Sequence, residues 1–382
     1  MSEGWQSALK RWREAGLVDA ATAERIRGYE AGQGGVLREG RLALIVFALG
    51  ALLLTAGALL FIAAHWDSLG PGGRFAIVLA AIAVLHAGGA VAAMRGSEAL
   101  SATLHAAGTG VFGAGIYLAG QVFHMAEHWP AGLLLWAAGA AVGVVLLRQW
   151  PQVLWLAVLA PAWLWGEWME AHDHGAAWRD LTPAAVGLVL LACAYLFARP
   201  AESAARWRRT LAWLGAVALI PAAVALAMSG DVDRAFEGVG QREVAGATRW
   251  LAWTVAIVLP LTLAWRLRGR ESLWMLAALA WALLLAQVSP HSNAGELAMY
   301  ALLEVGAVGI VLWGLRDGQR LAVNVGVLGF ALAMLGFYFA SLYDRFGRAL
   351  GLIGLGVLFI GGGWLLERTR RRLLARLPEY RP

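Results

Sequence analysis

Long hydrophobic runs separated by short polar loops recur along almost the whole chain. Many of them are close to the roughly 20 residues that an α-helix needs to cross the hydrocarbon core of a bilayer. Backbone groups in lipid must satisfy their own hydrogen bonds, so such runs form helices. Only 15% of the 382 residues are charged, whereas soluble domains carry about 25%. The sequence therefore predicts an all-α, polytopic transmembrane helical bundle.

About twelve segments have the length and apolarity of a membrane span. They are 42–64, 75–94, 103–122, 131–147, 153–168, 181–198, 210–228, 250–265, 272–288, 296–315, 321–341 and 349–366. The chain thus divides into a short module at 1–41, a transmembrane domain at 42–366 and a basic tail at 367–382. The short loops leave no room for a large catalytic domain outside the membrane.

The distribution of charge predicts an orientation. With the amino terminus in the cytoplasm, twelve spans return the carboxyl terminus to the same side, and most of the 31 Lys and Arg residues then face the cytoplasm. That bias follows the positive-inside rule. Arginine replaces lysine almost throughout, which is typical of a bacterial genome rich in G and C. We expect a multi-pass protein of the bacterial inner (plasma) membrane with both termini cytoplasmic.

The first 41 residues show helical periodicity. Leu9 and Trp12 share a face, Gly16 can end that helix, and Asp19 or Thr22 can cap a second one. This pattern predicts a cytoplasmic helical hairpin that packs on the membrane domain or binds a partner. Its basic residues favour the first helix, unlike a DNA-reading helix-turn-helix, so we expect no nucleic-acid partner.

Polar side chains inside the spans mark candidate sites, because each is unfavourable in lipid unless it is paired or hydrated. Glu304 is the acidic residue deepest within a span, Tyr300 lies one turn before it, and His86 lies near the middle of the second span. These three residues form our candidate intramembrane polar site, in which Glu304 and His86 could exchange a proton. The structural alternative is a protonated Glu304 bonded to a neighbouring helix.

The third span carries a line of residues that recur every four positions: His105, Thr109, Gly113, Tyr117 and Gln121. Four-residue steps drift around a helix of 3.6 residues per turn, so this line wraps rather than following one straight face. It could border a water-filled cavity, or its members could hydrogen-bond to neighbouring helices.

A second candidate site lies at the predicted outer mouth of the first three spans. Its residues are His65, Asp67, Arg74, Gln121 and His124. They could line an outer vestibule. Alternatively, Asp67 pairs with Arg74 and closes a structural corner around the glycines between them.

No complete catalytic, nucleotide-binding or metal-binding motif occurs in the sequence. His172, Asp173 and His174 are adjacent but lack the helical spacing of a zinc site, and Cys193 is the single cysteine. We therefore expect no metal and no cofactor. Enzymatic activity is the least favoured of the functions considered below.

Two stretches resemble a known family. Leu49–Arg74 contains Gly50-Ala-Leu-Leu-Leu and Phe61-Ile-Ala-Ala-His-Trp-Asp67, and a second stretch reads Gly115-Ile-Tyr-Leu-Ala-Gly-Gln121-Val-Phe-His124. Both resemble signatures of the bacterial predicted-membrane-protein family labelled domain of unknown function 2157 (DUF2157), although His65 stands where the family commonly has Asn. The resemblance covers residues 5–145 and implies a multi-span membrane protein without an established activity, substrate or catalytic residue.

Three functions fit these features. The first is a transporter or lipid translocator. It is favoured by the many spans, by the buried ionisable groups and by the prolines that interrupt predicted spans, namely Pro161, Pro221 and Pro260. The second is a non-catalytic scaffold or sensor whose amino-terminal hairpin recruits a partner. The third is an intramembrane enzyme. Membrane lipids are expected partners, together with an unidentified small molecule or protein.

Overall fold

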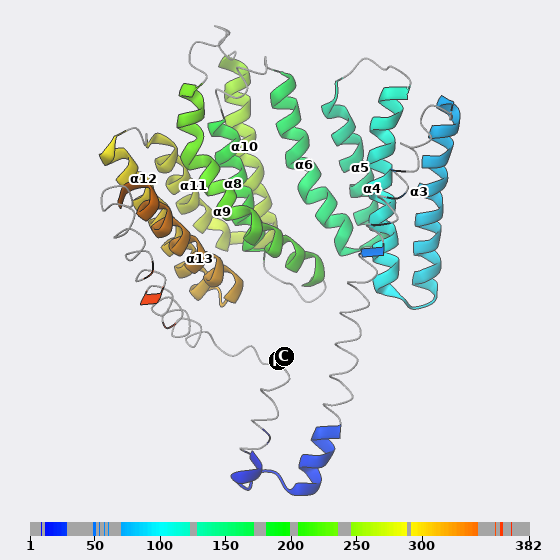
Figure 1. Ribbon diagram of the computed structural model, residues 1–382, viewed down its shortest axis with the longest axis horizontal. Helices are drawn as coiled ribbons and strands as arrows, with labels where there is room; N and C mark the ends of the chain where they lie inside the picture. The colour runs from blue at the N-terminus through cyan, green and yellow to red at the C-terminus, as the bar shows by residue number, and fades with distance from the viewer. Residues whose placement is uncertain are drawn as a thin grey trace. The chain divides into compact units, whose positions relative to one another are not determined.

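The computed structural model describes the chain in several stretches, and all regular structure within them is helical (Figure 1). The described residues are 9, 12–28, 49–50, 53, 57, 60, 70–122, 128–171, 181–198, 205–235, 246–288, 292–342, 356, 360–361 and 368. They belong to two compact units, Met1–Glu127 and His128–Pro382. For this part of the chain the all-α prediction is confirmed.

Local features of the amino-terminal segment follow the sequence pattern. Gly16 has a φ of 68°, and Leu17 N–H donates to the carbonyl of Trp12 at 2.9 Å, which ends the first helical turn. Asp19 Oδ1 accepts the backbone N–H of Thr22 at 2.7 Å and so caps the helix that follows. Hydrogen bonds from Thr22 lower the pKa of the Asp19 carboxyl below its ordinary value. The arrangement of the whole segment as a hairpin stays a prediction.

Two long antiparallel helices make up most of the first unit that is described. They are α3 (Pro71–Met94) and α4 (Glu98–Val122). Pro71 starts α3 at a position where its missing N–H is harmless. The turn between the helices places Gly96 at a φ of 77°, a conformation that glycine adopts without strain.

The described part of the second unit consists of consecutive α-helices, a short 3₁₀-helix (η2) and a short π-helix (η3); the α-helices are labelled in Figure 1. They are α5 (Pro130–Leu147), α6 (Trp150–Glu170), α8 (Thr182–Leu196), α9 (Ala205–Ala235), α10 (Gly246–Arg268), η2 (Gly269–Leu273), α11 (Trp274–Gln287), α12 (Asn293–Arg316), α13 (Arg320–Phe337) and η3 (Tyr338–Leu342). The pairs α5–α6, α8–α9 and α12–α13 pack as neighbours.

The described helices overlap each predicted span between 75–94 and 321–341. Within the described residues, six segments are long and apolar enough to cross a membrane: Pro71–Met94, Pro130–Leu147, Arg206–Ser229, Gly246–Gln287, Asn293–Arg316 and Arg320–Ala340. The 42-residue segment Gly246–Gln287 contains α10, η2 and α11, where two spans are predicted. The first and last predicted spans, 42–64 and 349–366, lie almost wholly outside the described residues, so the count of twelve stays a prediction.

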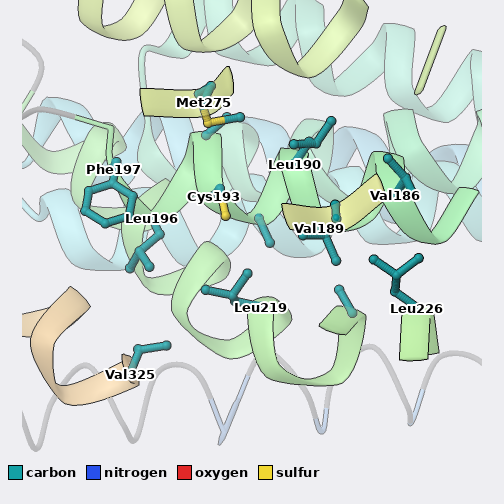
Figure 2. Close-up of a cluster of buried hydrophobic side chains, with 14 of the residues drawn as sticks. Val186, Val189, Leu190, Cys193, Leu196, Phe197, Leu219, Leu226, Met275 and Val325 are labelled. Carbon is teal, nitrogen blue, oxygen red and sulfur yellow. The ribbon is translucent and has the colours of Figure 1, made fainter. Parts of the chain in front are cut away.

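Helix α8 forms the centre of the second unit. Its side chains at Val186, Val189, Leu190 and Leu196 are completely buried. Figure 2 shows them together with Leu219 and Leu226 of α9, Met275 of α11 and Val325 of α13. A helix that is apolar on every side belongs in a protein interior or in lipid, and here neighbouring helices cover most of α8.

The contact between α8 and α9 depends on Gly215. A Cβ atom at this position would lie 2.3 Å from the backbone nitrogen of Leu196 and 2.5 Å from the carbonyl oxygen of Ala192. Both atoms belong to a helix backbone and cannot move aside independently. Glycine therefore sets the separation of the two helices.

A buried arginine joins three helix ends on one side of this unit. Arg268, at the end of α10, is 1% exposed; its Nη2 lies 2.5 Å from Oδ2 of Asp317, which is 3% exposed and follows α12. Its Nη1 donates to the carbonyl of Phe197, just beyond α8, at 2.9 Å. The rings of Phe197 and Trp313 stack at 3.8 Å beside the guanidinium. One cation thus forms an ion pair with a carboxylate and donates a hydrogen bond to a helix carbonyl.

We predict that Gly215→Ala destabilises the protein because the added methyl group forces α8 and α9 apart. Gly309→Ala is the matched control, since a Cβ there meets nothing within 4 Å and alanine is the better helix former. The thermal midpoint of purified protein should fall by several degrees only in the Gly215 variant. Equal midpoints would show that the two backbones can separate freely.

We predict that Asp317→Asn costs about 3 to 5 kcal/mol, because it leaves a buried guanidinium without its main counter-charge. The matched control is Glu271→Gln. Glu271 lies 3.5 Å from the same guanidinium but is 48% exposed, so its removal should cost less than about 1 kcal/mol. Unfolding free energies from SDS titration in mixed micelles measure both. Similar losses would contradict the assignment of Asp317 as the principal partner.

Candidate functional site

Two histidines face each other between α3 and α4. Nδ1 of His86 on α3 lies 2.9 Å from Nδ1 of His105 on α4, a hydrogen-bonding distance. The ring centroids are 5.2 Å apart and the planes are inclined by 33°. His105 is 4% exposed and His86 is half-buried. Sequence reasoning singled out His86, and the structure gives it His105 as its partner.

Glycine on the opposite helix makes room for each ring. A Cβ at Gly89 of α3 would come within 2.8 Å of the His105 ring, and one at Gly108 of α4 would come within 2.8 Å of Nε2 of His86. Any residue larger than glycine at these two positions would therefore displace the imidazole ring opposite it. Small residues that let helices approach closely are typical of packed membrane helices.

The polar line of the third predicted span contributes to this contact. Thr109 is buried and donates its hydroxyl to the carbonyl of His105 at 3.0 Å, within the same helix. Gln121, at the end of the line, is exposed. The two buried polar residues of this line, His105 and Thr109, are thus hydrogen-bonded within the hairpin.

Tyr300 and Glu304 lie on α12, in the second unit. The Tyr300 ring packs against Phe337 of α13 with centroids 5.6 Å apart, and it also contacts Gly336. Tyr300 lines a 630 Å³ cavity among α9, α11, α12 and α13, whose lining is mostly apolar. Glu304 is half-buried one turn further along. His86 belongs to the other unit, so the exchange of a proton between His86 and Glu304 stays a prediction.

The predicted outer vestibule is described in part. Arg74 lies in the first turn of α3 and Gln121 in the last turn of α4, so the antiparallel hairpin brings both to the same end. His65, Asp67 and His124 lie outside the described residues, as do His172 and its neighbours. The vestibule and the alternative corner both stay predictions.

A long apolar groove in the second unit was not predicted from the sequence. It has a volume of 1110 Å³ and is lined mainly by α6, α8 and α10, with further residues from the end of α5 and the start of α9. Its lining on α6 runs from Val153 to the residue after the helix, Ala171, and on α10 from Thr248 to Arg266. Pro161 and Pro260, two of the prolines that interrupt predicted spans, both line it.

The two ends of the groove differ in charge. Arg148, Arg266 and Trp207 line one end, and neither arginine forms an ion pair with a described residue. Glu167 lines the other end, where its carboxylate oxygens lie 2.8 Å from Nε2 of His128 and accept the indole N–H of Trp163 at 2.7 Å. The groove is thus apolar along its length, cationic at one mouth and acidic at the other.

Metal coordination is not indicated in the described stretches, which contain no group of three His, Cys, Asp or Glu side chains placed to hold an ion. The two histidines are directed at each other through their Nδ1 atoms. They have the geometry of a shared hydrogen rather than of a metal site.

A family model described as a predicted membrane protein (DUF2157) matches residues 10–153. The resemblance found in the sequence is therefore confirmed, over a range that contains the α3–α4 hairpin. Together with the long apolar helices, it shows a membrane protein, and the family description gives no activity. No curated protein and no solved structure matches the chain.

We predict that Gly108→Ala abolishes the hydrogen bond between His86 and His105, because the new methyl group occupies the space of the His86 ring. Nitrogen-15 NMR of histidine-labelled, full-length protein in liposomes should show that the bridging N–H···N signal is lost. Gly88→Ala is the control, since its Cβ would meet only Leu104 Cδ1 at 3.4 Å. An unchanged signal in the Gly108 variant would contradict the contact.

Proposed function

We propose that the protein is a membrane transporter of the lipid-translocator class and that the α6–α8–α10 groove holds an amphipathic lipid with an anionic head group. The observation that carries this proposal is the apolar groove with two arginines at one mouth that form no ion pair with any residue in the described stretches. No other cavity among those described combines such length with an end that bears two cations.

The dimensions of the groove suit a lipid. From Val153 to Ala171 the lining rises about 27 Å along α6, close to the roughly 30 Å of a hydrocarbon core. Its volume of 1110 Å³ exceeds the usual range of about 300–1,000 Å³ for small-molecule sites. A long flexible molecule fills such a space better than a compact metabolite does.

Selectivity has to come from the head group. An acyl chain gains little by moving from lipid into an apolar groove, because both surroundings are equally apolar. Arg148 and Arg266 can instead donate charge-assisted hydrogen bonds to phosphate, and guanidinium groups match phosphate oxygens in pairs. Trp207 beside them is an aromatic residue of the kind that settles at the level of lipid head groups.

The acidic residue at the second mouth favours lipid movement in one direction. An anionic head group is attracted by Arg148 and Arg266 and disfavoured near Glu167. We assign the arginine mouth to the cytoplasmic face, in line with the predicted topology of twelve spans, cytoplasmic termini and a bacterial inner membrane. Lipid would be captured at the cytoplasmic side and released at the acidic side.

One observation favours the alternative of a scaffold or sensor. In the amino-terminal segment, Trp12 is 47% exposed and Leu17 is 74% exposed. Large exposed apolar side chains on one short segment fit a protein partner. A scaffold of this kind would keep its partner when the groove is altered and lose it when residues 1–37 are removed.

The test compares lipid carried by wild-type protein with that carried by Arg148→Gln/Arg266→Gln. Native mass spectrometry of gently extracted, full-length protein should show anionic phospholipid bound to the wild type and reduced at least tenfold in the double variant. Each lost hydrogen bond to a charged group is worth about 1.5 to 3 kcal/mol, and about 1.4 kcal/mol is tenfold in affinity. Movement of fluorescent phosphatidylglycerol between leaflets of liposomes should fall in parallel.

Arg320→Gln is the matched control, because Arg320 is an exposed arginine at the start of α13 and does not line the groove. It should leave lipid occupancy unchanged. Equal loss in this variant would mean that overall charge, and not the groove, determines binding. Normal lipid binding without movement between leaflets would contradict translocation.

A further inference from the structure

We propose that His86 and His105 form a two-residue proton relay, which takes up a proton at Nε2 of one ring and releases one from Nε2 of the other. This proposal rests on the α3–α4 hairpin alone and is independent of the lipid groove. The ligand is a proton, and the two rings pass it along the hairpin.

The contact between the rings fixes where hydrogens can lie. With Nδ1 atoms 2.9 Å apart, two facing lone pairs or two facing N–H groups would repel, so one hydrogen lies between them. In the neutral pair, the donor ring carries its hydrogen on Nδ1 and has a bare Nε2. The acceptor ring carries its hydrogen on Nε2.

Proton uptake then follows from this arrangement. A hydronium ion gives its proton to the bare Nε2 of the donor ring, which leaves water and makes the ring an imidazolium. The bridging hydrogen moves to Nδ1 of the acceptor ring, the N–H bond of the first ring breaks, and the positive charge crosses with it. The second ring then gives the proton on its Nε2 to a water molecule, which becomes a hydronium ion. One proton has entered, one has left, and both rings are neutral again with exchanged tautomers.

The direction of transfer follows the helix axes. His105 lies beside Gly89 and His86 lies beside Gly108, on antiparallel helices. His105 is therefore nearer the turn at Arg95 and His86 is nearer the opposite end of the hairpin. Helix α3, which carries His86, is one of the segments long and apolar enough to cross a membrane, and α4 packs beside it with a length of about 37 Å at about 1.5 Å per residue.

The surroundings of the two histidines favour transfer of the positive charge from ring to ring over a permanently charged imidazolium. Among the described residues of the two helices, the other titratable groups are Arg74, Glu98 and Tyr117, with Arg95 in the turn. Glu98 lies seven residues before His105, about 10 Å along the helix, and no carboxylate follows in the helix interior. Among these described residues a permanently charged imidazolium would have no buried counter-ion, and an unbalanced charge is unfavourable in lipid surroundings.

The exchange of tautomers adds a constraint. A second proton can follow in the same direction only after the rings return to their first tautomers. That return requires the bridging hydrogen bond to break, so α3 and α4 have to loosen once for each proton. The relay thus couples proton movement to a change in the packing of the hairpin.

The test measures proton flux into liposomes of phosphatidylethanolamine and phosphatidylglycerol that contain full-length protein and a pH-sensitive dye, with valinomycin and potassium to dissipate charge. We expect flux above that of protein-free liposomes in the wild type. His86→Asn and His105→Asn should each reduce this flux at least tenfold, and the double variant should be no lower. His291→Asn, a histidine outside the hairpin, should keep the wild-type rate.

Wild-type flux equal to that of protein-free liposomes would overturn the proposal, and so would normal flux in either single variant. If the asparagine variants fail to fold, the glycine pair decides the question. Gly108→Ala retains both imidazoles but displaces one, so flux should be lost, whereas Gly88→Ala should preserve it. Normal flux in a folded Gly108→Ala protein that lacks the bridging NMR signal would also refute the relay.

Discussion

The second unit is organised around the need to hydrogen-bond the carbonyl groups at the end of a short buried helix. Helix α8 has 15 residues and is about 22 Å long, less than the roughly 30 Å of the hydrocarbon core. Its last carbonyls would therefore lack water, and each unsatisfied group is unfavourable by several kcal/mol. Arg268 donates to Phe197 at this end, and Arg208 likewise donates to Leu267 at the end of α10. Because Asp317 balances the charge of Arg268, α12 is held at the same place.

Both proposed sites combine an apolar scaffold with a few polar groups whose positions are fixed by packing. In the hairpin, Gly89 and Gly108 leave room for two imidazoles that would not otherwise meet. In the groove, the lining is apolar along its length and the charged side chains lie at the two mouths.

The sequence predicted the helices because the fixed rise per residue of an α-helix determines how long an apolar run must be to cross a membrane. The helix end at Gly16 and the cap at Asp19 were also predictable, since both are local. The partner of His86 was not, because Glu304 and His105 are equally plausible until the packing of helices is known. Arg148 and Arg266 were counted only as charges that set topology. Their convergence at one mouth depends on the arrangement of α5, α6 and α10, which no local pattern specifies.

The hydroxyl of Tyr195 has a mechanical consequence for the groove. It donates to the carbonyl of Ala157 at 3.2 Å and ties α6 to α8, and the residues packed around this bond include Leu211 and Leu267 near the arginine mouth. Helices α8 and α9 are held close together at Gly215, and both contribute to the lining of the groove. The bond from Tyr195 therefore holds α6 against this pair at the arginine mouth. Any change in the width of the groove is then expected to be largest at the acidic mouth, away from the bond.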